Sequence, residues 1–333
     1  MEVTLQETIW DAPIMCFLPV SSTGLSRGTS FSLLVGVILN VLIQGAFCNI
    51  LYFDDDFTST TMFTEKIQQM KRWRLTTGHD MSQMDMAGTS LVARVCGQDL
   101  SLSVATSQVA IVGQIYRYIN WREDGIDREK AQIESQEVLE ILSMTGPAMC
   151  SVCVLLWSLI ILSELRKIIS LLLGVCSIPK GPTVFVENQF LSISYIRLAW
   201  VLLLTAVRAG VAIMLLITGI LWLTHTSSIS DLILNAAALH FIMDLDEMLY
   251  AVITPSDAQL LLRSIEPLPY KRVRKHMEAV VPLSLFVVIL IFTLSNFVLP
   301  NVASMFQLRE IMCGGERDFV SAMSNQGLPL CFS

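Results

Sequence analysis

Long apolar runs are the feature that most constrains this chain. Four of them, at residues 30–52, 145–175, 195–224 and 280–299, are long enough to cross a bilayer as helices. Hydrophobic residues make up 53% of the 333-residue sequence and charged residues 15%, whereas soluble domains carry about 25% charged residues. The sequence therefore predicts an all-α protein: a polytopic integral membrane helical bundle with about five spanning or near-spanning helices.

A fifth apolar segment, residues 228–254, is unusual because it contains several ionisable side chains. A rotation of about 100° per residue places His240, Asp244 and Glu247 together on one side of a helix, with Asp246 in a second polar stripe beside them. Charges in hydrocarbon are costly, so such a helix must face protein, water or an ion. We interpret the segment as an acidic amphipathic helix that crosses the membrane. A re-entrant arm and a helix lying at the interface are the alternatives.

The spacing of residues in this segment resembles that of a group of known sequences. It is similar to a segment of uncharacterised multi-pass membrane proteins of protists and algae through the pattern Asp231-x-x-x-Asn235, Leu239-x-Phe241, Asp244-x-Asp246-Glu247-x-x-Tyr250 and Pro255. The resemblance covers less than a tenth of the chain. It implies a multi-pass membrane protein and transfers neither a function nor a site residue to this sequence.

Lysine and arginine residues on the short loops predict how the chain is oriented in the membrane. The extension at the end of the second run contains Arg166 and Lys167, the loop after it contains Lys180, and the linker before the last run contains the basic cluster at residues 271–275. All of these stretches are expected to face the cytosol. The long polar region and the C-terminal tail are then expected outside, and the N-terminus inside.

The predicted segments follow from these runs. The first run comes soon after Arg27 and is expected to be an uncleaved anchor, with a cleaved signal peptide as the alternative. In chain order the predicted segments are an N-terminal segment (1–29), a first span (30–52), a partly helical extramembrane region (53–144), a second span with a cytoplasmic extension (145–175), a linker (176–194), a third span (195–224), the acidic helix (228–254), a basic linker (255–279), a last span (280–299) and a tail (300–333).

Arg208 lies deep within the third run and is expected to need an acidic partner, because an unpaired arginine is costly at this depth. The segment at residues 228–254 returns antiparallel beside this run, so the middle of one meets the middle of the other. This geometry predicts that Arg208 pairs with Asp244. His240 is the alternative neighbour, and Glu247 is left freer to meet an ion.

One stretch of the polar region has a spacing typical of a metal site. Thioether sulfur suits Cu(I), and the stretch resembles the methionine motifs of copper importers through His79, Met81, Met84 and Met86. A chance cluster in a flexible loop is the competing interpretation. No cofactor is expected.

Two cysteines, Cys313 and Cys331, bracket the polar tail. A disulfide between them is predicted if the tail lies outside the cytosol, where the compartment is oxidising. Two free thiols are the alternative, because the spacing alone does not establish the geometry that a disulfide needs.

Movement of cations is the function that these features favour. No phosphate-binding loop, HExxH or GxSxG motif is present, so no enzyme is expected, and the net charge of −7 argues against nucleic acid. We expect a cation channel or transporter subunit in the plasma membrane or an endomembrane, with a non-transporting structural or accessory membrane subunit as the alternative. The expected partners are the lipid bilayer, cations, and further copies or a larger membrane complex. The ion pathway or intramembrane charge network is expected to contain Arg208, His240, Asp244, Asp246 and Glu247.

Overall fold

The structure is a computed structural model of the 333-residue chain. It describes residues 2–16, 26–53, 62–119, 144–186, 188–269, 275–323 and 329–332. Within these ranges the backbone is mostly helical, and the strands form three antiparallel two-stranded sheets. The predicted all-α class is therefore confirmed.

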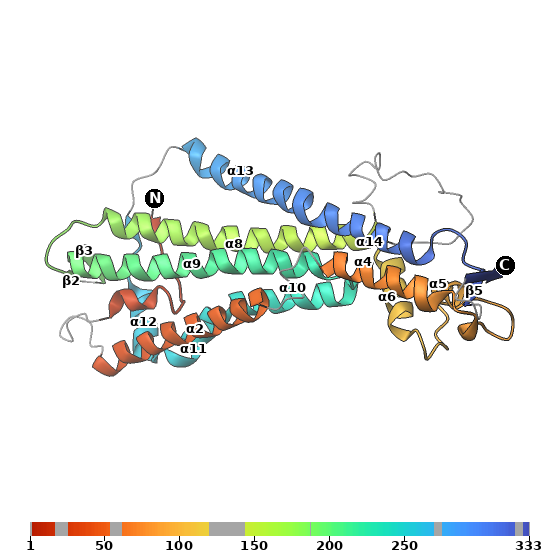
Figure 1. The fold of residues 1–333 in the computed structure, drawn as a ribbon. Helices are drawn as coiled ribbons and strands as arrows, with labels where there is room; N and C mark the ends of the chain where they lie inside the picture. The colour runs from red at the N-terminus through yellow and green to blue at the C-terminus, as the bar shows by residue number, and fades with distance from the viewer. Residues whose placement is uncertain are drawn as a thin grey trace. The chain divides into compact units, whose positions relative to one another are not determined.

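Four helical stretches in the described residues are long and apolar enough to cross a membrane. They coincide with the four apolar runs of the sequence (Figure 1). They are α2 (Arg27–Phe53), α8 (Thr145–Ser177), α9 (Tyr195–His225), and the continuous stretch formed by α13 (Lys275–Thr293), the π-helical turn η4 (Leu294–Val298) and α14 (Leu299–Cys313). The sequence placed the end of the last span at residue 299, whereas the helix continues through Pro300, because proline is tolerated in the first turn of α14.

The acidic segment is also helical, and it is interrupted once. The shorter apolar helix α10 (Ile229–Met243) ends at Asp244, and α11 (Leu245–Ile253) begins directly after it. Asp244 has φ −79° and ψ −1°, a right-handed conformation whose ψ lies well above the value of about −42° usual for an α-helix. The segment is therefore two helices in sequence, and not the single uninterrupted helix that periodicity suggested.

The chain folds as two compact units. The first consists of Met1–Asp54, Leu155–Ile220 and Asn235–Leu290; the second consists of Asp55–Val154, Leu221–Leu234 and Ile291–Ser333. The boundaries between the units fall within α8, α9, α10 and α13. Each unit has its own cluster of buried apolar side chains.

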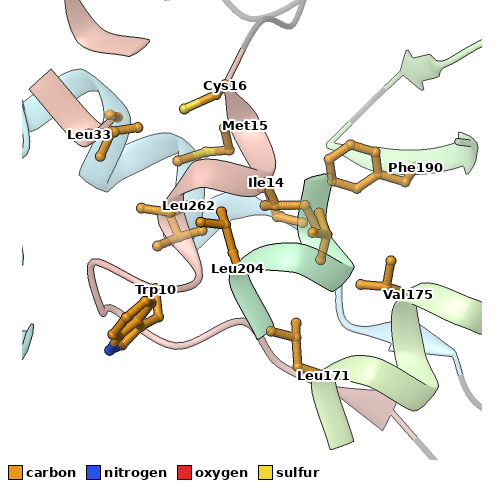
Figure 2. Packing of buried hydrophobic residues seen from close by; sticks show 14 of the residues in the cluster. Trp10, Ile14, Met15, Cys16, Leu33, Leu171, Val175, Phe190, Leu204 and Leu262 are labelled. Atoms are coloured by element: carbon orange, nitrogen blue, oxygen red, sulfur yellow. The ribbon is translucent and has the colours of Figure 1, made fainter. Parts of the chain in front are cut away.

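The core of the first unit is organised around the N-terminal segment. Ile9 and Ala12 have no exposed surface, and the 3₁₀ turn η1 (Ala12–Met15) contacts both α2 and α12 (Ser256–Ser264). Figure 2 shows side chains of this segment lying among residues of α8, α9 and α12, including Leu171, Leu204 and Leu262. Two short sheets complete the unit, β1 (Glu2–Val3) with β4 (Leu268–Pro269), and β2 (Val184–Val186) with β3 (Gln189–Ser192).

The second unit combines the polar region with the end of the last helical stretch. Buried side chains of its helices form one cluster that includes Met70, Val92, Val112 and Met305. The elements of this unit are α4 (Met62–Trp73), the π-helical turn η2 (Arg74–Gly78), the 3₁₀ turn η3 (Met81–Gln83), α5 (Leu91–Cys96), α6 (Thr106–Ile119), α14, and the hairpin of β5 (Val320–Met323) and β6 (Pro329–Phe332).

Arg74 attaches the C-terminal tail to this unit. Its Nη1 donates to the carbonyl of Ile311 at 2.8 Å, and its Nη2 donates to the carbonyls of Gly314 and Glu316 at 2.6 and 3.2 Å. Its Nε donates to Nε2 of His79 at 3.3 Å. Arg74 therefore binds neutral acceptors only in these contacts.

The disulfide of the described residues joins Cys96 to Cys313. The predicted pairing of Cys313 with Cys331 is therefore wrong; Cys331 lies in β6, and its side chain is outside the described part of the chain. The two bonded cysteines are separated by 217 positions, and they meet because α5 packs against α14. The polar region and the tail must therefore lie on the same side of any membrane that the chain spans. A disulfide is typical of an oxidising compartment, which supports the predicted placement outside the cytosol. Residues 271–274 of the basic linker are outside the described residues.

Candidate functional site

Arg208 is buried in the first unit and binds two carboxylates. Its side chain, near the middle of α9, is 3% exposed. Nη1 donates to Oδ1 of Asp11 at 2.7 Å, and Nε donates to Oε1 of Glu164 at 2.7 Å. Nη2 lies 2.5 Å from the same Glu164 oxygen, in ionic contact. The planar guanidinium thus joins the N-terminal segment to α8 and α9, because its donors point in fixed directions.

Both carboxylates are held by further contacts. The backbone N–H of Gln6 donates to Oδ2 of Asp11 at 2.8 Å, and Asp11 is 3% exposed. Glu164 is 12% exposed, and Nζ of Lys167 lies 3.5 Å from its Oε2. The positions of both acids are therefore determined by the fold, and not by Arg208 alone.

The predicted pairing of Arg208 with Asp244 is wrong. The Asp244 side chain is 51% exposed, and its Oδ2 lies 3.6 Å from Nε2 of His240, one turn earlier in the helix. Arg208 instead meets Asp11, from a segment with no helical pattern, and Glu164, from the neighbouring span. From the middle of the acidic segment, Asp246 lines the same small cavity as Arg208.

Asp246 lines a small cavity beside this cluster. Its side chain is 7% exposed, and the cavity of about 10 Å³ has the size that a single water molecule needs. The charged and polar groups around the cavity are Asp246, Glu164, Arg208 and Gln44, and the apolar ones are Trp10, Val211, Ala212, Leu215 and Met243.

Two amides of α2 lie next to the interruption between α10 and α11. Nε2 of Gln44 donates to the carbonyl of Ile242 at 3.0 Å, and Nδ2 of Asn40 donates to Oε1 of Gln44 at 3.3 Å. Asp246 and Glu247 stand in the first turn of α11, where a helix dipole favours negative charge. A polar group from α2 thus binds the backbone next to the interruption of the acidic segment.

The buried charges of this cluster do not balance. Three carboxylates, from Asp11, Glu164 and Asp246, share one deeply buried guanidinium, from Arg208. Lys167 adds a positive charge at the edge, with its side chain 38% exposed. An uncompensated buried charge is strongly unfavourable. Binding of a proton or a cation would therefore stabilise the cluster.

The remaining predicted residues of the acidic segment lie outside this cluster. His240 is 59% exposed, Asp244 is 51% exposed and Glu247 is also exposed. Sequence periodicity grouped them correctly on one side, but this side faces away from the cavity. Only Arg208 and Asp246 of the five predicted charge-network residues take part in the cavity lining.

Sequence reasoning missed Asp11, Glu164, Asn40 and Gln44. Asn40 and Gln44 had a usable signal, since two amides four positions apart in an otherwise apolar run lie on one helix face and need partners. Glu164 lies in the stretch that the sequence predicts to be a cytoplasmic extension of the second span. Asp11 had no signal, because nothing in its short, mixed segment indicates burial.

The candidate metal ligands are arranged differently from a metal site. Nδ1 of His79 lies 2.9 Å from the carbonyl of Phe319, and Nε2 accepts from Arg74, so both ring nitrogens are engaged. Met81, Met84 and Met86 are 43%, 36% and 106% exposed. Among the described residues no group of three or more His, Cys, Asp or Glu side chains is arranged to hold a metal ion. Copper binding by the three methionines stays a prediction.

Comparisons with protein-family models, with curated proteins and with solved structures gave no match. The resemblance of residues 231–255 to multi-pass proteins of protists and algae therefore stays a prediction.

Proposed function

We propose that this protein, a mostly helical chain with four candidate membrane spans, is a transporter or channel subunit that carries protons through the Arg208 cluster. The observation that carries the proposal is Asp246, a nearly fully buried carboxyl group beside a water-sized cavity. Ionisable groups within membrane segments are typical of ion paths and proton relays.

A proton fits this cluster better than a metal cation. The cavity has room for about one water and not for a hydrated ion. Asp246 is the proton acceptor in this proposal. Beside it, Arg208 stays bound to Asp11 and Glu164 throughout.

Measurement of proton flux tests this function. The purified protein is reconstituted into liposomes that contain a pH-sensitive dye, and an imposed potential drives protons inward. We expect dye acidification with the native protein and loss of it, to the level of empty vesicles, with Asp246→Asn, which keeps the shape of the side chain. Asp231→Asn, at an exposed acid near the start of α10, is the matched control and should retain the flux. A native protein that is no faster than empty vesicles contradicts the proposal.

A non-transporting accessory subunit is the second candidate, and one observation favours it. Asp244 and Glu247 do not line the cavity, so the acids do not form a row along one path. In that case Arg208 binds the N-terminal segment to the spans, the native protein is no faster than empty vesicles, and Asp246→Asn leaves assembly unchanged.

A further inference from the structure

The outward side of α10 and α11 carries a stripe of ionisable side chains. We call His240, Asp244 and Glu247 the acidic stripe; His240 and Asp244 are 59% and 51% exposed, and Glu247 is exposed as well. Large apolar side chains of the same two helices are also exposed, with Phe241 59% and Val252 84% exposed. Such a surface suits neither water nor lipid tails, because one part is apolar and the other is charged.

The acidic stripe lies at the level of the Arg208 cluster. Asp246 belongs to the same helical turn as Asp244 and Glu247, and it lines one cavity with Arg208 and Glu164. Arg208 is near the middle of α9, which is a candidate span. The stripe is therefore within the apolar part of the first unit, at the level of the middle of α9.

A basic group is exposed at the same level on α8. Arg166 is exposed and stands two positions after Glu164, which binds Arg208. The apolar side chains of Leu159 and Ile169, at helical spacing from Arg166, are 45% and 55% exposed. We call Arg166, Leu159 and Ile169 the basic patch. In Figure 1, within the first unit, α8 and α11 lie on opposite sides of α9.

We propose that a second copy of this chain covers the acidic stripe, and that its basic patch places Arg166 against Asp244 and Glu247. Opposite charges at one level, each surrounded by apolar side chains, give the two faces complementary charge and similar polarity. The contact is heterologous, because two different faces of the same chain meet, and repetition of it closes a ring or extends a row. A symmetric contact of stripe with stripe is disfavoured, because it places like charges together.

Charge-reversed chains test this arrangement. One chain carries Arg166→Glu and the other carries Asp244→Arg with Glu247→Arg, each with a different affinity tag. Either variant alone places like charges across the contact, so both are expected to be monomeric in mild detergent and in nanodiscs. In the mixture each changed face meets a face of opposite charge, so co-expression should restore co-purification of the two tags. Restored assembly also shows that both variants fold.

A cross-link locates the contact. Chains with Arg166→Cys and Asp244→Cys, in a background with Cys176→Ser because Cys176 is exposed, are expected to form a disulfide-linked pair that carries both tags. Val252→Cys in place of Asp244→Cys is the matched control and should cross-link less. A monomeric native protein, equal assembly of all variants, or a mixture that assembles no better than its parts overturns the proposal. Cross-linking of Asp244→Cys to a different protein shows that another chain with a basic helix covers the stripe, and also overturns it. None of these outcomes depends on proton transport.

Discussion

Two arginines, Arg208 in the first unit and Arg74 in the second, organise their surroundings in different ways. Arg208 meets two carboxylates, with a third beside the cavity, whereas Arg74 donates to three backbone carbonyls and to a neutral histidine nitrogen. None of the four groups that accept a hydrogen bond from Arg74 carries a negative charge. The Arg208 cluster has more acid than base, so it can take up a proton, and the Arg74 contacts attach the tail.

The largest expected effect is that of Arg208→Leu. This change leaves three carboxylates buried with no cation in the centre, and loss of one partner of a buried pair costs about 3–5 kcal/mol of stability. We expect little folded protein on size-exclusion chromatography in detergent. Arg197→Leu is the control on the same helix, because Arg197 donates to the neutral carbonyl of Ile14. Equal yields of the two variants contradict the role of carboxylate burial.

Removal of the disulfide is expected to have the next largest effect, confined to the second unit. Cys96→Ala with Cys313→Ala opens a link across 217 positions, and such links contribute typically about 2–4 kcal/mol. Faster hydrogen exchange is expected in α5 and α14, with little change around Arg208. Cys48→Ala, at a buried free cysteine of the first unit, is the control. Unchanged exchange in α5 and α14 would show that the link is not formed.

Acidic pH is expected to weaken the attachment of the C-terminal tail, with a smaller effect than either of the changes above. Burial lowers the pKa of His79, repulsion from Arg74 adds to this, and the Phe319 carbonyl opposes it. Because the folded pKa is lowered, the contribution of His79 is complete above its ordinary pKa of about 6.5 and is lost as the pH falls below it. Limited proteolysis of the tail should therefore accelerate in acid, and His79→Gln should flatten the pH profile. A native profile that is flat from pH 7 to acid is the contrary result.

Much of the fold was predictable because the length of an apolar run indicates directly whether its helix can span a membrane. The four apolar runs became four candidate spans, and the sequence also indicated that Arg208 needs an acidic partner. The identity of the partner was not predictable. Helical periodicity separates Asp246 from His240, Asp244 and Glu247, but it does not say which side faces the interior. In this segment apolar side chains such as Phe241 and Val252 face outward, so the usual rule for soluble helices points the wrong way.

The long-range contacts required the tertiary fold. Asp11 reaches Arg208 only because the N-terminal segment is buried among helices that follow it by more than a hundred residues. The sequence prediction paired Cys313 with its near neighbour Cys331, whereas the packing of α5 against α14 joins Cys313 to the distant Cys96. Both errors have the same cause. Residues that are close or regularly spaced in the sequence were treated as partners, whereas the packing of the folded chain determines which side chains meet.

Infrared spectroscopy of the purified protein tests whether the acids around Arg208 hold a proton. A protonated carboxylic acid has a carbonyl stretching band that an ionised carboxylate lacks, and exchange into deuterated water shifts it. At neutral pH the account predicts such a band in the native protein, its loss in Asp246→Asn, and its retention in the control Asp244→Asn, where the changed acid is exposed. A native spectrum without the band, or a band that Asp246→Asn leaves unchanged, would contradict the account.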